Sequence, residues 1–227
     1  MEMKGRKTVT KSILLLLCLV VALLLPLVVL SAGQTAAADA PTVILDPGHG
    51  GFDPGAIGVS GTEEDDLNLA VALLLKAELE SRGITVLLTR EKDEALGQSK
   101  TEDMHKRRDL IANSGAHCAV IIHMNSHPDA SCMGPVAIHY AGSENGARLA
   151  GYIQQELISR LQPQKERAAY GETYFILKGG AVPSVIVECG FLSNPTEEAL
   201  LLDAGYQNKL AFAIAEGVTR YLTPQSE

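Results

Sequence analysis

The 227-residue sequence has few cysteines and no excess of basic residues. Three of its four cysteines, Cys118, Cys132 and Cys189, follow the first hundred residues, and their odd number and irregular spacing exclude a disulfide framework. Cys118 and Cys189 lie in apolar runs and are expected to be buried thiols, with one pairing left open. The formal net charge is −8, and it becomes −10 without residues 1–40, which hold four of the 19 basic and two of the 27 acidic residues. Such an acidic domain has no electrostatic signature of nucleic-acid binding.

The first 40 residues differ from the rest. Four basic residues and one acid precede eighteen uncharged, mostly apolar residues, 13–30. This pattern predicts an export signal or a membrane anchor whose basic flank stays in the cytoplasm. An AAA sequence before Asp39 suits signal peptidase, so we favour cleavage slightly. The protein is expected to be exported and to be secreted, membrane-anchored or associated with the cell wall, and only this segment should touch the membrane.

The remaining chain shows no internal repeat and no second domain. We predict one folded domain over residues 41–223 and a short tail, 224–227. Strand-like and helix-like segments alternate, with strands expected at 42–46, 84–90, 118–123, 135–140, 173–177 and 184–190. Helices are expected at 64–81, near 104–113 and at 144–161, and 197–222 is expected to be helical for most of its length. Nearly continuous apolar strands separated by helices predict an α/β fold: a twisted, mostly parallel sheet of about six strands with helices on both faces.

Several polar residues fall where the apolar strands end. In open α/β sheets, sites form at the carboxyl ends of the strands. His49 follows the first strand, His123 and Glu188 end two others, and Glu63 and Glu64 open the first helix. Two histidines and up to two carboxylates should therefore meet, which is the ligand set of a catalytic zinc site. A carboxylate that does not bind the metal can carry a proton, so the predicted chemistry is amide hydrolysis.

Each of these residues could also have a purely structural role. A single histidine at a strand end is more often structural, and Glu188 could be a partner in a buried ion pair. The GHGG at 48–51 could cradle a phosphate, but neither a P-loop lysine nor a G-x-G-x-x-G sequence accompanies it. The remaining histidines are expected to be surface or core residues: His105, His117, His127 and His139.

Four stretches together resemble the zinc-dependent N-acetylmuramoyl-L-alanine amidases of bacterial cell-wall metabolism. They are LDPGHGG, the E-x-x-L-N-L that begins at Glu64, IHMN at 122–125 and VECGFLSNP at 187–195, and the resemblance covers Val43 to Leu222. It implies one Zn²⁺ per chain, held by His49, Glu64 and His123, with Glu188 as the catalytic carboxylate. The family spacing selects Glu64 over Glu63 as the ligand.

Some positions depart from the family pattern or match it weakly. Asp65 stands where a basic residue is usual and is expected to make the rim of the site more acidic. Asp103, Met104 and Arg107 resemble a family segment in which the arginine supports structure or substrate, although a solvated helix face explains them equally well. Asn125 either binds the peptide or turns the chain.

The resemblance implies hydrolysis of the amide bond between N-acetylmuramic acid and L-alanine of the peptidoglycan stem peptide. The short form of the chain is most similar to the germination-specific amidase of endospore formers, which acts in spore cortex maturation; general wall turnover is the rival role. Whether a protein partner activates the enzyme stays open. Two alternative functions remain: a catalytically inactive, zinc-containing regulator that binds the wall, and a zinc peptidase that cuts within the stem peptide.

Overall fold

The computed structural model describes residues 40–178 and 180–223. Residues 1–39, where the export segment is predicted, and the predicted tail therefore lie outside the described residues. No helix in the described part combines the length and apolar character needed to cross a membrane.

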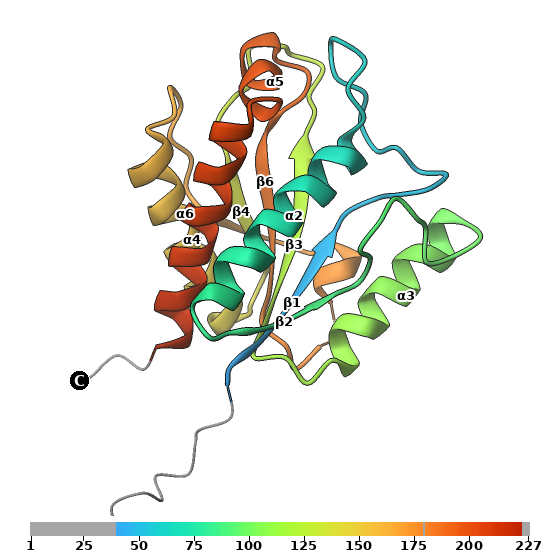
Figure 1. Ribbon diagram of the computed structural model, residues 1–227, viewed down its shortest axis with the longest axis vertical. Helices are drawn as coiled ribbons and strands as arrows, with labels where there is room; N and C mark the ends of the chain where they lie inside the picture. Colours follow the sequence, from blue (N-terminus) through green and yellow to red (C-terminus); the bar gives the residue numbers. More distant parts are fainter. Residues whose placement is uncertain (1–39, 179, 224–227) are drawn as a thin grey trace, which may run out of the picture. The chain divides into compact units, whose positions relative to one another are not determined.

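A six-stranded sheet forms the centre of the domain (Figure 1). The strand order is β2-β1-β3-β6-β4-β5, and every neighbouring pair is parallel except β4 and β6, which are antiparallel. The strands are β1 (Thr42–Pro47), β2 (Thr85–Leu88), β3 (Cys118–Asn125), β4 (Val136–Tyr140), β5 (Tyr170–Glu172) and β6 (Ser184–Phe191). The predicted mostly parallel sheet of about six strands is confirmed.

Helices cover both faces of this sheet, as predicted. Three long helices pack on one face: α2 (Glu64–Ser81), α4 (Glu144–Leu161) and α6 (Ala204–Leu222). The other face carries α3 (Lys100–Asn113) and the short 3-10 helix η1 (Phe175–Leu177), while α5 (Pro195–Leu201) follows β6. Because strand side chains alternate, Val43 and Leu45 belong to the core under the three long helices and Ile44 belongs to the core under α3. Burial on both faces explains why the strands are continuously apolar.

The structure corrects or refines three element predictions. Residues 173–177, expected to be a strand, contain η1, and the sixth strand is β5 just before them. Residues 197–222 are helical for most of their length, as predicted, but they form two helices, because Asp203 accepts a hydrogen bond from the backbone N–H of Tyr206 and starts α6 anew. The apolar residues at 200–202 concealed this break. Helix α3 begins at Lys100, four residues before the predicted start near Met104, because the Ser99 hydroxyl caps it by accepting a hydrogen bond from the N–H of Glu102.

The cysteines of the described part form no disulfide. Cys118, Cys132 and Cys189 are free, and Cys118 and Cys189 are buried as predicted. Burial raises the pKa of both buried thiols. These two side chains therefore act as small apolar core residues.

Candidate metal centre and active site

Two of the four predicted site residues occupy regular strand positions. His123 on β3 and Glu188 on β6 are directly paired in the parallel register. Residues two positions earlier, Ile121 and Ile186, face the core under α3 and η1. Because the pleat repeats every two residues, His123 and Glu188 emerge on that same face at the carboxyl edge of the sheet.

The first histidine sits on a loop with an unusual backbone. His49 has a φ of 60°, in the left-handed region that residues with a side chain seldom adopt. The glycine before it leaves room for the second histidine, since a Cβ on Gly48 would lie 2.3 Å from the His123 ring. The glycine-rich sequence after β1 therefore lets the loop turn sharply and pass against the His123 ring.

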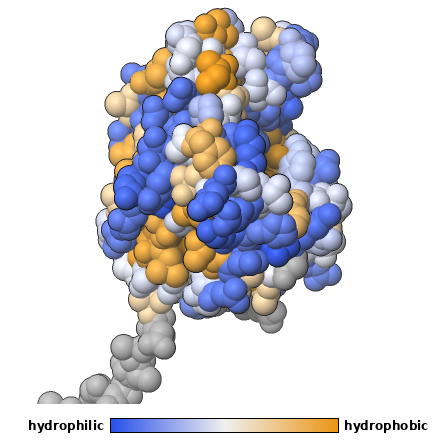
Figure 2. All heavy atoms as spheres, turned by 90° about the vertical axis from the view of Figure 1, so that its right-hand side faces the viewer, coloured by the Kyte–Doolittle hydropathy of each residue, from blue (hydrophilic) through white to orange (hydrophobic). Residues whose placement is uncertain are grey.

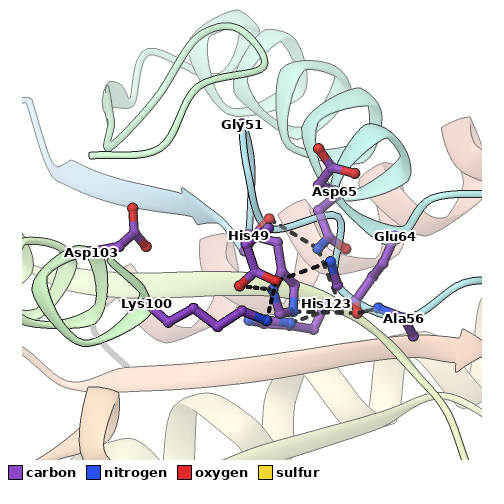
Figure 3. A network of polar contacts seen from close by, with 12 residues as sticks. His49, Gly51, Ala56, Glu64, Asp65, Lys100, Asp103 and His123 are labelled. Carbon is purple, nitrogen blue, oxygen red and sulfur yellow. Dashed lines mark hydrogen bonds and ion pairs between the residues drawn. The ribbon is translucent and has the colours of Figure 1, made fainter. Parts of the chain in front are cut away.

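Glu64, the first residue of α2, joins the two histidines (Figure 3). Its Oε1 lies 2.8 Å from Nδ1 of His123, and its Oε2 lies 3.3 Å from Nε2 of His49. The backbone N–H groups of Met124 and Ala56 also donate to this carboxylate. Burial would raise the pKa of Glu64, but the hydrogen bonds and charges of the two histidines outweigh burial and lower it. Glu64 is therefore ionised and held in place from several sides.

These three side chains have a geometry that suits one metal ion. One ligand atom from each of His49, Glu64 and His123 can be chosen so that all lie within 4.8 Å of one another. Ligand atoms about 2.0–2.1 Å from a tetrahedral zinc ion are roughly 3.4 Å apart, close to the 2.8 and 3.3 Å contacts of Glu64. Two imidazoles and a carboxylate are also the donors that zinc prefers. Glu63 precedes α2 and is not part of this group, in agreement with the choice of Glu64.

Glu188 lies beside this group without belonging to it. Its Oε2 is buried and has no hydrogen-bond partner within the described residues. Burial raises the pKa of Glu188, and the neighbouring charge of Glu64 adds to this effect while the two histidines oppose it. An unpaired carboxylate oxygen at a site edge is uncommon in folded proteins and indicates a place for a reacting group. The structure therefore brings all four predicted residues together.

Two buried arginines hold the backbone of the His49 loop. Arg107 of α3 donates to the carbonyl oxygens of Pro47 and His49 and forms ion pairs with Asp46 and Asp103. From the sequence alone, a position on a solvated helix face explained Arg107 equally well. That alternative is wrong, because only 2% of Arg107 is exposed.

Sequence reasoning missed Arg90, the second of these arginines. It donates to the carbonyl oxygens of Pro47, Gly48 and Asp65, so it links the His49 loop to the first turn of α2, next to Glu64. Its one visible signal was a charged residue two positions after the apolar strand β2.

Asp53 and Lys100 had no recognisable signal in the sequence. Asp53 Oδ2 lies 2.9 Å from Nδ1 of His49, and Asp53 Oδ1 lies 2.7 Å from Nζ of Lys100 at the start of α3. Burial lowers the pKa of His49, but Glu64 and Asp53 outweigh it and raise that pKa to about 9. A carboxylate on Nδ1 fixes the orientation of the ring and points Nε2 toward Glu64.

Predictions about the remaining single residues fare unequally. Asp65 does not make the rim acidic, because it is buried; burial and nearby acids raise its pKa to about 6. Asn125 ends β3, and its carbonyl oxygen accepts from the N–H of Leu192, so its backbone continues the pairing of β3 with β6. As predicted, none of the four remaining histidines belongs to the group of His49, Glu64 and His123. His117, for example, accepts a hydrogen bond from the N–H of Thr42.

Comparison with known proteins agrees with this geometry. A family described as N-acetylmuramoyl-L-alanine amidase matches residues 43–220. Over 193 residues the chain is 34% identical to the germination-specific N-acetylmuramoyl-L-alanine amidase of Bacillus subtilis (strain 168). The aligned region covers 82% of this chain and 81% of that relative. The predicted family and enzyme class are confirmed.

Solved structures with the same fold include two amidases that are at least 30% identical to this chain. The CwlD amidase from Clostridioides difficile, in complex with the GerS lipoprotein, has a TM-score of 0.77 at 37% identity. The match covers 80% of this chain and 98% of the CwlD chain. The catalytic domain of CwlV from Bacillus (Paenibacillus) polymyxa var. colistinus has a TM-score of 0.73 at 30% identity. This match covers 80% of this chain and 98% of the CwlV domain.

Proposed function

Because the chain belongs to the N-acetylmuramoyl-L-alanine amidase family, we propose that His49, Glu64 and His123 hold one Zn²⁺ and that Glu188 is the catalytic carboxylate. The observation that carries this proposal is the contact of one carboxylate, Glu64, with both histidines, next to the unpaired oxygen of Glu188. A zinc ion in that position would polarise the scissile carbonyl and make water easier to deprotonate.

In this proposal, three side chains bind the metal and Glu188 transfers the proton. His49 and His123 each direct a ring nitrogen at the Glu64 carboxylate, so the three side chains form a fixed cradle. Glu188 Oε2 takes a proton from the attacking water, whose oxygen bonds to the lactyl carbonyl carbon. The same oxygen atom of Glu188 gives that proton to the L-alanine nitrogen as the C–N bond breaks. The products are a glycan with a free lactyl carboxylate and a stem peptide with a free amine.

The raised pKa of Glu188 suits both halves of this cycle. A carboxylate with a pKa nearer to neutral is a better proton acceptor than an ordinary glutamate and also returns the proton readily. Burial supplies most of that upward shift. Position and proton affinity thus support the same role.

The test replaces Glu188 with glutamine, which keeps size and polarity but cannot accept the proton. We expect Glu188→Gln to retain one zinc per chain and to lose at least about a hundredfold in kcat, since removing proton transfer costs about 10²–10⁴-fold. Zinc content is measured by atomic absorption after dialysis, and turnover by mass spectrometry of digested peptidoglycan. Near-normal turnover by this variant would show that another group is the base.

The same mass spectra separate the two alternative functions. Unchanged muropeptides indicate a regulator without turnover, cuts between amino acids indicate a peptidase, and peptide-free glycan indicates the amidase. A parallel digest with a chelator tests the metal, because the proposal expects turnover to stop and to return when zinc is added.

For the cellular role we propose export and action on spore cortex peptidoglycan. The similarity to the B. subtilis germination-specific amidase and to the C. difficile CwlD amidase supports this role. Since that CwlD structure contains a lipoprotein partner, we extend the proposal to an activating protein partner for this chain. Full activity of the purified chain alone would contradict the need for a partner, and normal cortex muropeptides in a deletion strain would contradict the cortex role.

A further inference from the structure

A second group of acidic side chains begins at Asp65, next to the metal centre. Asp65 follows Glu64 in α2, but the two carboxylates point in opposite directions (Figure 3). Only 3% of Asp65 is exposed, and its Oδ1 has no hydrogen-bond partner within the described residues. A buried carboxylate oxygen normally faces a hydrogen-bond donor or a cation, because leaving it without either is costly.

Two more carboxylates lie near Asp65. Asp66 is the next residue of α2, and Asp93 lies in the segment that joins β2 to α3; both are exposed. Burial raises the pKa of Asp65, and the charges of Asp66 and Asp93 and a side-chain contact with Asp93 raise it further. This contact directs the buried carboxylate of Asp65 at the exposed carboxylate of Asp93.

The guanidinium group beside these acids is engaged elsewhere. The four hydrogen bonds of Arg90 go to main-chain carbonyl oxygens, among them that of Asp65, and none goes to a carboxylate. When all four groups are ionised, three carboxylates beside one guanidinium leave two negative charges unbalanced. A divalent cation supplies the missing charge.

We propose that Asp65 and Asp93 bind a calcium ion and that Asp66 adds to the negative charge of the site. Ca²⁺ takes oxygen ligands in a flexible geometry, and carbonyl oxygens or water complete its shell. The donors here are carboxylates without an imidazole, unlike those of the proposed zinc site, so the two sites select different ions. The exposed Asp93 opens the site to solvent.

The approach to this site suits a hydrated ion. The segment between β2 and α3, which includes Asp93, crosses the side of the molecule that faces the viewer in Figure 2. Hydrophilic residues cover much of that side. An ion that keeps part of its water shell can therefore reach the carboxylates from solvent.

An ion at this place connects two supports of the His49 loop. Asp93 Oδ1 accepts a hydrogen bond from the N–H of Gly51, two residues after His49. Asp65 belongs to the first turn of α2, and its carbonyl oxygen accepts from Arg90. Because calcium then binds the folded chain and not the unfolded chain, the temperature of unfolding reports its binding.

The experiment titrates the zinc-loaded protein with CaCl₂ and, separately, with MgCl₂ in a calorimeter. Scanning calorimetry then gives Tm with and without calcium. The site variants are Asp65→Asn and Asp93→Asn, which keep the size of the side chain and remove one charge. Glu144→Gln is the matched control, because Glu144 is also an acid in the first turn of a long helix but is exposed and lies on α4.

We expect one calcium ion per chain, with a Kd of about 10⁻⁴–10⁻³ M, as in extracellular sites. Mg²⁺ should bind more weakly, because it requires a nearly ideal octahedral shell. Each aspartate variant should bind calcium at least tenfold more weakly than wild type. In calcium-free buffer each should also have a higher Tm than wild type, because one repelling charge is gone. Glu144→Gln should match wild type in both measurements.

No calcium binding at about 10 mM Ca²⁺ overturns the inference and leaves a shared proton as the reason for the contact between Asp65 and Asp93. Wild-type calcium affinity in both aspartate variants, or tighter binding of Mg²⁺, overturns it as well. Zinc content is measured for every variant, and calcium binding that disappears together with zinc would assign the ion to Glu64 and overturn the second site. A chain that binds calcium but no zinc would contradict the proposed zinc site and leave the calcium site standing.

Discussion

The two histidines of the metal centre reach the same carboxylate from very different supports. His123 belongs to a regular strand, whose neighbours β1 and β6 hold it by backbone pairing. His49 lies on a loop in a left-handed conformation, and Arg90, Arg107 and Asp53 hold that loop through side chains.

The difference shows how a rigid site can include an irregular segment. A strand position is fixed by the sheet, so the local sequence needs only an apolar run that ends in histidine. A loop has no such ladder, and its carbonyl groups need partners from elsewhere once they are buried. The two guanidinium groups supply those partners here, and they connect the loop to α2 and α3 at the same time.

The largest effect should come from removing either histidine, because both are proposed to bind the same ion. His49→Ala and His123→Ala should each lose stoichiometric zinc and at least about a thousandfold in kcat/KM, equivalent to about 4 kcal/mol of lost metal catalysis. His139→Ala is the control, since this partly buried histidine of β4 does not belong to the proposed set of metal ligands. Zinc retained by either site variant, measured after dialysis, would contradict the shared ion.

The next effect concerns the supports of the loop. Arg107→Met leaves the buried carboxylates of Asp46 and Asp103 without their partner, so the free energy of unfolding should fall by about 3–5 kcal/mol. Arg90→Met removes hydrogen bonds to carbonyl groups only, and those of Pro47 and Gly48 keep a second donor, so it should cost less, about 1–3 kcal/mol. Urea unfolding measures both values.

Lys76→Met is the control for these two variants. Its partners Glu80 and Glu91 are exposed, so the expected loss is at most about 1 kcal/mol. If Arg107→Met were no less stable than Lys76→Met, the loop would not depend on the buried guanidinium group.

A smaller effect is expected from Asp53→Asn, which disturbs the loop-borne histidine alone. Asparagine keeps the size of the side chain but loses the charge that orients the His49 ring, so zinc affinity should fall about 10–100-fold. Competition with a fluorescent chelator gives the dissociation constant. Asp203→Asn at the start of α6 should leave zinc affinity unchanged, and equal affinities of the two variants would remove Asp53 from the support of His49.

The smallest effect involves pH and the segment that runs from His49 to α2. Glu198 of α5 accepts hydrogen bonds from the backbone and hydroxyl of Ser60. Burial acts to raise the pKa of Glu198, but these hydrogen bonds and those of Thr62 outweigh it and lower the pKa below its usual value. The folded state therefore binds this proton less readily than the unfolded state, so the stabilisation is present above the unfolded pKa of about 4.3 and is lost as pH falls through the folded pKa.

Glu198→Gln should accordingly be less stable than wild type by about 1 kcal/mol at pH 7, and the difference should shrink toward pH 3. Urea unfolding at several pH values measures it. A difference that stays constant over this range would mean that the charge of Glu198 does not hold the segment at Ser60.

Much of the fold followed from periodicity alone. Helices 64–81 and 144–161 have the predicted bounds, because an amphipathic pattern with clear ends leaves little choice. The pattern failed at residues 173–177, where five residues are too few to separate a strand from a 3-10 turn. It also gave no sign of the break at Asp203, where one capping side chain separates two helices.

The sequence by itself determined the alternating strands and helices and the four groups at their ends, because apolar periodicity and the position of the first polar residue are local properties. Only the tertiary structure decided which side chains hold the His49 loop. Arg90 and Arg107 lie 41 and 58 positions from His49, and Asp65 is buried although its neighbours in sequence are polar. Contacts between such distant residues depend on how the helices dock on the sheet, and no local pattern records that docking.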